Sequence, residues 1–146
     1  MNSSNDSLAM QRITKLVDEN SFMEIGSLVT ARNTDFNLAD TDTPSDGVIT
    51  GHGLVDGNLV FVYSQNAAVL NGTIGEMHAK KIAAVYDMAM KMGAPVIGFI
   101  DCAGMRLQES VDALNGLVRS TQRRLQHPAL FRRFPLFSEA VAVDLQ

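Results

Sequence analysis

Residues 75–110, GEMHAKKIAAVYDMAMKMGAPVIGFIDCAGMRLQES, contain the alternation of helix and strand signals that decides the fold. Apolar residues recur at roughly helical spacing from Met77 to Met90, and the sequence MGAP then supplies the glycine and proline that end a helix. The run PVIGFID that follows is continuously apolar, which is typical of a strand buried in a parallel sheet. Another helix is expected to begin near Leu107. This order of elements predicts mixed α/β layers.

The chain before this stretch predicts one more helix and a hairpin. Apolar residues near the start, at positions 8, 13, 16 and 17, are spaced as one face of a short helix. Residues 32–46 are rich in Asp, Thr and Asn and indicate a loop. Residues 47–65, GVITGHGLVDGNLVFVYSQ, contain two β-branched runs around the turn Val55–Asn58, in which Gly57 can take a positive φ.

Composition limits the classes of function that are open to this chain. It has 146 residues and a net charge of −4, so as a whole it does not attract nucleic acid or an anionic membrane. Its single cysteine, Cys102, excludes an internal disulfide framework and a multi-cysteine zinc site. The three histidines, His52, His78 and His127, show no metal-ligand spacing, so no metal site is expected.

Two stretches bear on where the protein resides. The amino-terminal residues, MNSSNDSLAM, are polar and lack the apolar core of a signal peptide. The most apolar stretch, residues 82–100, is interrupted by charged residues, glycine and proline, so it is not expected to span a membrane. With a lone cysteine, these features predict a cytoplasmic protein.

Two glycine turns are candidate binding sites. The turn Asp101–Met105 follows the carboxyl end of a predicted strand, where backbone N–H groups can point at a carbonyl oxygen or a phosphate. The turn Asn71–Glu76 opens the preceding helix and offers similar groups, but it is neither a Walker loop nor a GxGxxG fingerprint. For each turn, an ordinary connection without a ligand remains the alternative.

Several side chains have both a functional and a structural interpretation. Cys102 is a possible nucleophile at a helix start, although a small buried residue is the favoured interpretation. Lys80, Lys81 and Arg106 are either solvated helix charges or contacts to phosphate. The methionines at 88, 90 and 92 are expected to fill the core.

Read together, three stretches resemble a known family. They are DGVITGHGLVDGNLVFVYSQ, the quoted residues 75–110, and VDALNG, and the resemblance extends from about Arg12 to Gly116. The chain is similar here to the carboxyltransferase subunits of biotin-dependent acyl-CoA carboxylases and decarboxylases, above all those that act on methylmalonyl-CoA or glutaconyl-CoA. Family members usually have two glycines and a serine where this chain has Asn71-Gly72-Thr73.

The resemblance implies a ClpP/crotonase-like superhelix of stacked β-β-α turns, of which residues 1–116 would form the amino-terminal part of the N domain. In such a family, a carboxyl group passes between biotin, carried by a separate biotin carrier protein, and the carbon alpha to the acyl-CoA thioester. Backbone N–H groups stabilise the enolate without reorganisation of solvent. The implied partners are acyl-CoA, the biotin carrier protein and other carboxyltransferase subunits in a homo-oligomer.

The resemblance also implies roles for particular residues. The N–H groups of Ala103 and Gly104 are the candidate enolate donors, and Arg106 is expected near the CoA. No side-chain acid or base is expected to act. The acyl-CoA-binding candidates are Gly72, Thr73, Gly75, Asp101, Ala103, Gly104, Met105 and Arg106.

The composition changes abruptly at Leu117. Residues 117–146 contain five arginines and no lysine, and in residues 123–137, RRLQHPALFRRFPLF, neither helical nor strand periodicity is sustained. After ALNG the family continues FGEIY, and one choice of codons for GLVRST encodes that sequence in a shifted reading frame. We therefore predict that residues 117–146 are an out-of-frame translation and not a domain. A basic tail that binds a partner is the alternative.

These features predict a truncated carboxyltransferase subunit that is inactive by itself. An alternative is a fragment of a crotonase-type acyl-CoA hydratase or isomerase, which would require a catalytic glutamate on a later helix. A second alternative is a non-catalytic module that docks on an intact carboxyltransferase subunit.

Overall fold

The computed structural model describes residues 7–31, 43–126, 132–135 and 142–145. The short 3-10 helices are η2 (Pro44–Gly47), η3 (Leu70–Gly72) and η4 (Leu107–Glu109). The other elements, in chain order, are α1 (Leu8–Leu16), β1 (Met23–Ile25), β2 (Val48–Val55), β3 (Asn58–Gln65), β4 (Thr73–Ile74), α2 (Glu76–Met92), β5 (Val96–Phe99), β6 (Gly104–Met105), α3 (Ser110–Gln126), β7 (Arg132–Pro135) and β8 (Ala142–Leu145).

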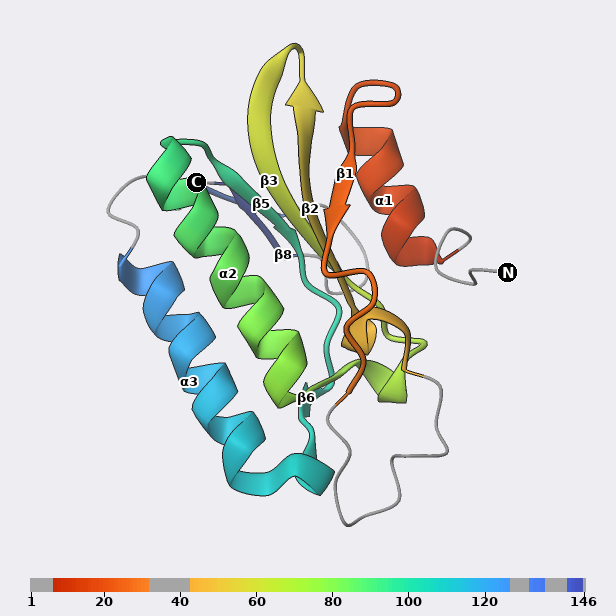
Figure 1. The fold of residues 1–146 in the computed structure, drawn as a ribbon, viewed down its shortest axis with the longest axis vertical. Helices are drawn as coiled ribbons and strands as arrows, with labels where there is room; N and C mark the ends of the chain where they lie inside the picture. Colours follow the sequence, from red (N-terminus) through yellow and green to blue (C-terminus); the bar gives the residue numbers. More distant parts are fainter. Residues whose placement is uncertain (1–6, 32–42, 127–131, 136–141, 146) are drawn as a thin grey trace.

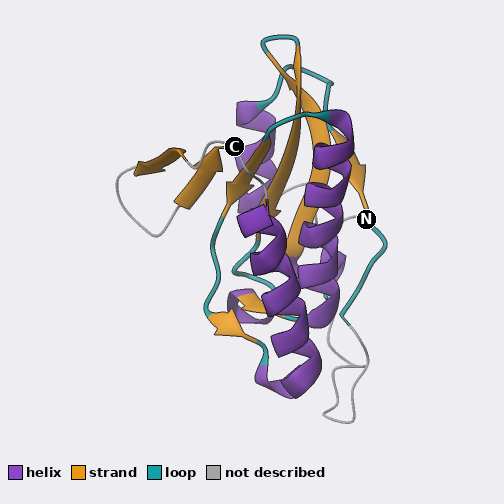
Figure 2. Ribbon diagram, turned by 90° about the vertical axis from the view of Figure 1, so that its left-hand side faces the viewer, coloured by secondary structure: helices purple, strands orange, loops and turns teal. Residues whose placement is uncertain are grey.

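The strands form one main sheet in the order β1-β2-β3-β5-β8-β7 and a small sheet of β4 with β6. The β3–β5 and β4–β6 pairs are parallel, and the other pairs are antiparallel. Helix α1 lies against one side of the main sheet and α2 against the other, with α3 outside α2 (Figure 1). Seen from the left-hand side of that view, α2 and α3 stand in front of the main sheet (Figure 2). The predicted α/β layering is confirmed.

The hairpin forms as the sequence predicts. Strands β2 and β3 pair from Val48 opposite Gln65 to Val55 opposite Asn58. The two central turn residues, Asp56 and Gly57, have φ values of 50° and 77°. Positive φ at both positions is the geometry that matches the twist of the flanking strands, which explains why Asp-Gly stands there.

Two apolar clusters lie on opposite sides of the main sheet. On one side, α1 contributes Ala9, Met10 and Ile13, which pack on residues of β2, β3 and β5. On the other, α2 contributes Ile82, Val85, Tyr86 and Ala89. This β-β-α unit, a hairpin followed by a helix and a parallel strand, carries the candidate site at its strand ends.

Two predictions about core residues are wrong in part. Leu8, expected on the buried face of α1, is 58% exposed, because Ala9 and Met10 occupy that face. Met90 and Met92, expected to fill the core, are exposed, and of these three methionines only Met88 packs against the core. The helical period places positions 82, 85, 86 and 89 toward the sheet, and therefore turns 90 and 92 away from it.

Helix α3 continues past the point where the composition changes. It runs from Ser110 to Gln126 and packs on α2, where a Cβ on Gly116 would lie 2.9 Å from the Cβ of Ala79. Glycine thus permits a close approach of the two helices. Part of the remaining tail forms β7 and β8, which extend the main sheet beyond β5. The out-of-frame origin of residues 117–146 stays a prediction. His127 lies outside the described residues.

In the part of the chain that the structure describes, no helix is long and apolar enough to cross a membrane.

Candidate functional site

The two glycine turns that the sequence singles out lie side by side. Strands β4 and β6 pair in parallel, with Thr73 opposite Gly104. Gly72 has a φ of 68°, and a Cβ there would lie 3.0 Å from the carbonyl oxygen of Asp101. Because glycine alone fits both the conformation and the space, this residue allows the two turns to touch.

The backbone donors of the Asp101–Met105 turn are partly engaged within the protein. The N–H of Ala103 donates to the carbonyl oxygen of Gly72 over 3.0 Å. The structure therefore gives no support to Ala103 as a free enolate donor. Gly104 has a φ of 113° and open space around its Cα, so its conformation itself favours glycine.

Arg106, the residue after β6, has no exposed surface. With Asp46 and Glu109 it forms a buried ion cluster, the Arg106 clamp. Arg106 Nη1 lies 2.7 Å from Asp46 Oδ1 and 2.6 Å from Glu109 Oε1. Its Nη2 donates to the carbonyl oxygen of Thr73, and its backbone N–H donates to that of Ile74. The guanidinium thus fastens β6 to β4. Its expected contact with CoA stays a prediction.

The amino terminus of α2 is occupied by two carboxylates of the chain. Glu109 Oε2 accepts a 2.5 Å hydrogen bond from the Glu76 N–H, and Asp46 Oδ2 accepts a 2.6 Å bond from the His78 N–H. These carboxylates satisfy donors that a helix start would otherwise offer to an anion. That the turn Asn71–Glu76 holds an anion stays a prediction, with the N–H groups of Glu76 and His78 already engaged by the chain itself.

Gly75 is required by this buried cluster. A Cβ at this position would clash with Arg106 Nη1 and lie 2.5 Å from Glu109 Oε1. A direct contact of Gly75 with acyl-CoA stays a prediction, but its observed neighbours are the clamp residues.

Burial changes the proton affinity of two groups near the clamp. Burial raises the pKa of Asp46, and the neighbouring Arg106 guanidinium works against that rise. Burial also lowers the pKa of Lys81 to about 8. Lys81 Nζ donates to the carbonyl oxygens of Ser45 and Val48, at 3.0 and 2.6 Å, and so holds η2 against β2 and α2.

The three basic residues that were predicted to be either solvated charges or phosphate contacts lie in different environments. Lys80 is solvated and pairs with Glu76 Oε1 at 2.7 Å. Lys81 and Arg106 are buried, so a solvated helix charge is the wrong interpretation for both.

A second set of polar contacts holds Asp101, at the start of the Asp101–Met105 turn. Gln65 Oε1 accepts from the Asp101 N–H at 2.9 Å, and Gln65 Nε2 lies 2.9 Å from His78 Nε2. Arg12 of α1 pairs with the Asp101 carboxylate at 3.0 Å. The sequence patterns did not predict the roles of Arg12 and Gln65 or the structural role of His78. The only local signals were a glutamine at a strand end and a histidine on the buried side of α2.

An open hollow of about 560 Å³ lies beside this turn. Among the residues that line it are Arg12 and Asp101, and the loop after β3 contributes Ala67 and Ala68. Cys102 is exposed, so the prediction of a buried cysteine is wrong. It lies in the connection between β5 of the main sheet and β6 of the small sheet, and so belongs to neither packed sheet.

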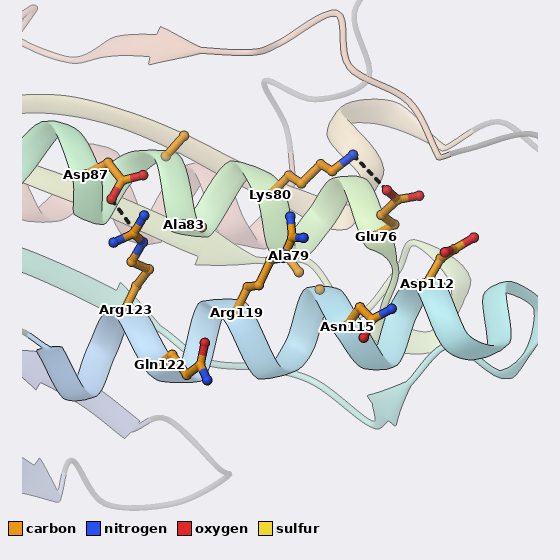
Figure 3. A pocket seen from close by; sticks show the side chains of 12 residues that line it. Glu76, Ala79, Lys80, Ala83, Asp87, Asp112, Asn115, Arg119, Gln122 and Arg123 are labelled. Carbon is orange, nitrogen blue, oxygen red and sulfur yellow. Dashed lines mark ion pairs between the residues drawn. The ribbon is translucent and has the colours of Figure 1, made fainter.

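A second hollow, of about 620 Å³, lies between α2 and α3 (Figure 3). Ion pairs stand along it, between Lys80 and Glu76 and between Asp87 and Arg123 at 3.1 Å. None of the acyl-CoA-binding candidates lines this groove. Of these two hollows, only the one beside Asp101 is lined by one of the acyl-CoA-binding candidates, Asp101 itself.

Among the described residues, no cluster of three or more His, Cys, Asp or Glu side chains is arranged to hold a metal ion.

Comparison with known proteins identifies the family. The family described as "Carboxyl transferase domain" matches residues 2–129. The propionyl-CoA carboxylase beta chain of Roseobacter denitrificans is 48% identical over 117 residues, which are 80% of this chain and 23% of that protein. The methylmalonyl-CoA decarboxylase subunit alpha of Propionigenium modestum is 49% identical over 108 residues, covering 74% of this chain and 21% of that protein.

A solved structure supports the same family and fold. The crystal structure of transcarboxylase 12S with methylmalonyl-coenzyme A and methylmalonic acid bound superposes with a TM-score of 0.80 at 32% identity. The match covers 82% of this chain and 24% of that one, so the chain spans about a fifth to a quarter of these relatives. The predicted crotonase-like α/β fold is thereby confirmed. The chain belongs to the carboxyl transferase domain family.

Proposed function

We propose that this chain is the amino-terminal part of a carboxyltransferase subunit that binds an acyl-CoA beside the turn Asp101–Gly104. The observation that carries the proposal is the open hollow of about 560 Å³ at this turn, bounded by Asp101 and the loop after β3. The names of the relatives, propionyl-CoA carboxylase and methylmalonyl-CoA decarboxylase, support a short acyl-CoA as the ligand.

The proposed reaction is transfer of a carboxyl group between biotin and the carbon alpha to the thioester. Biotin, held by a carrier protein, supplies the activated carboxyl group, and no described residue of this chain is assigned to it. The contribution of this chain is to bind and orient the acyl-CoA. Gly104 is the remaining candidate backbone donor to the enolate oxygen, since the Ala103 N–H is engaged with Gly72.

The proposal includes truncation and the need for partners. The chain corresponds to about a quarter or less of its relatives, so it is expected to be inactive without the remaining parts of the subunit. Helix α3 exposes several large apolar side chains, which supports contact with other carboxyltransferase subunits. Among them, Val111 and Leu114 precede the predicted out-of-frame tail. The exposed free thiol of Cys102 fits a reducing, cytoplasmic location.

The test is direct binding of propionyl-CoA to the full chain, measured by isothermal titration calorimetry. Ala68→Trp, which fills the hollow beside Asp101, should abolish the binding. Ala84→Trp adds the same bulk to the groove between α2 and α3 and serves as the matched control, because it should leave the affinity unchanged. Absence of binding by the unmodified chain, or equal loss in both variants, would contradict the proposal.

A further inference from the structure

The Asp101–Arg106 segment is held at both ends by one connected set of buried polar side chains. At its start, the Asp101 N–H donates to Gln65 Oε1. At its end, Arg106 is paired with Asp46. Between these contacts, His78 bridges Gln65 and Asp46. The segment therefore has a fixed backbone at the place where the proposed function needs it.

The partners determine the protonation of His78. Its Nδ1 lies 2.9 Å from the carbonyl oxygen of Asp46, which can only accept, so Nδ1 carries a hydrogen. The Gln65 oxygen already accepts from Asp101, so the Gln65 amide NH₂ faces His78 and donates to Nε2. His78 is thus the neutral imidazole with its hydrogen on Nδ1. In the series of hydrogen bonds from Asp101 through Gln65 and His78 to Asp46, each residue donates to the next.

This order makes Gln65 and His78 dependent on one another. A hydrogen on His78 Nε2 would face the Gln65 NH₂, and the amide would have to rotate to remove that conflict. The rotated amide would then present its NH₂ to the Asp101 N–H, so that two donors would face one another and the Asp101 N–H would lose its acceptor. A change at His78 would in this way reach the Asp101 backbone.

We propose that Gln65 and His78 are positioning residues, which act through the Asp101 N–H to fix the Asp101–Gly104 turn for acyl-CoA. The proposal rests on the proposed function for the identity of the ligand. Its structural part, the dependence of the turn on Gln65, stands on the contacts alone. Both side chains are almost completely buried; Gln65 reaches the wall of the hollow beside Asp101, whereas His78 does not line it.

The experiment compares Gln65→Met with the matched control Thr50→Val in the full chain. Thr50 is also buried in the main sheet and donates one hydrogen bond, to the carbonyl oxygen of Ile25 at 2.8 Å, away from the turn. Gln65→Met should shift the backbone amide resonances of residues 101–104 in ¹⁵N NMR spectra and weaken propionyl-CoA binding by about tenfold. Thr50→Val should lower the thermal midpoint without either change.

Unshifted resonances of residues 101–104 in Gln65→Met would overturn the proposal, whatever the affinity. So would a loss of affinity in Thr50→Val that matches the loss in Gln65→Met. If the unmodified chain binds no propionyl-CoA, the proposed function fails, and the amide shifts still decide whether Gln65 positions the turn.

A second variant covers the case in which Gln65→Met does not fold. Gln65→Glu keeps an acceptor for the Asp101 N–H but places a carboxylate oxygen against His78 Nε2. His78 should then carry hydrogens on both ring nitrogens near neutral pH, visible in its ¹⁵N ring shifts. A neutral His78 beside an ionised Glu side chain at position 65, read from that residue's ¹³C carboxyl shift, would show that the two side chains are not coupled.

Discussion

Arg106 Nη1 and Asp46 Oδ1 lie 2.7 Å apart, although 60 positions separate the two residues in the sequence. The same nitrogen lies 2.6 Å from Glu109, and both carboxylates also accept backbone N–H groups at the start of α2. One guanidinium therefore connects η2, β4, β6 and α2. This buried cluster places two carboxylates against the backbone N–H groups at the amino terminus of α2.

Arg106→Met should destabilise the chain by about 3–5 kcal/mol, because it leaves the two carboxylates buried without their cation. The measurement is urea denaturation followed by circular dichroism. Arg123→Met is the control: its ion pair with Asp87 is largely exposed, so the loss should be about 0–1 kcal/mol. Similar losses in the two variants would show that the buried clamp contributes no more stability than an exposed ion pair.

Gly75→Ala should destabilise the chain by about 1–3 kcal/mol, because the added methyl group overlaps Arg106 and Glu109. The shift in thermal midpoint measures this effect. Gly57→Asn is a suitable comparison, since no atom lies within 4 Å of a Cβ there and asparagine tolerates the positive φ. We expect a change below about 0.5 kcal/mol for Gly57→Asn, and an unaltered midpoint in Gly75→Ala would refute the predicted clash.

Lys81 should make stability rise with pH in alkaline solution. Its pKa falls from 10.5 to about 8 on folding, so between these values the unfolded chain binds more protons than the folded one. Unfolding free energy should therefore increase from pH 8 toward 10.5, by at most about 1.4 kcal/mol per pH unit for one proton. Below pH 8 the effect of Lys81 is constant.

Denaturation curves at several pH values between about 7.5 and 10 test this slope. Lys81→Met should reduce it, whereas Lys80→Met, which removes the exposed neighbouring lysine, should not. A slope that is unchanged by Lys81→Met would assign the pH dependence to other groups.

Gly104→Ala should destabilise the β4–β6 connection by about 1–3 kcal/mol, because its φ of 113° is strained for any residue with a Cβ. Since open space surrounds the position, the cost is conformational and not steric. Propionyl-CoA titration should show weaker binding, with amide shifts confined to the turn and its neighbours. Wild-type affinity in Gly104→Ala would argue against a role of this backbone in the site.

DNA sequencing around codon 116 should reveal, in the shifted frame, an open reading frame that begins FGEIY and continues as in the family. The same DNA must encode residues 117–146 in the frame that continues from Gly116. A stop codon soon after Gly116 in the shifted frame would contradict the out-of-frame origin of the tail.

The sequence was most informative where one local pattern determined one local structure. The Asp56-Gly57 pair specified the hairpin turn, and the Gly93 stop signal marked the end of α2. The apolar run of β5 correctly indicated a parallel neighbour, which is β3. Local patterns were less reliable at α2. The run of methionines suggested burial, but the helical period turns Met90 and Met92 toward solvent.

The candidate site illustrates the limit of such patterns. Glycine spacing and resemblance to a family located both turns, but they did not reveal that Gly72 touches Asp101 or that the Ala103 N–H is engaged. They also left open whether Lys81 and Arg106 are surface charges. Burial of a charge depends on partners from distant segments, and no local period records those partners.

The sequence by itself determined the order of elements, the hairpin, the family and the two glycine turns that build the candidate site. Only the tertiary structure decided which polar groups meet, because Asp46, His78, Gln65 and Arg106 come together through packing of η2, α2, β3 and the segment after β6. A buried ion or amide must satisfy its hydrogen bonds wherever the fold brings a partner. The roles of these residues were therefore set by contacts across the sheet and α2, and not by their neighbours in the chain.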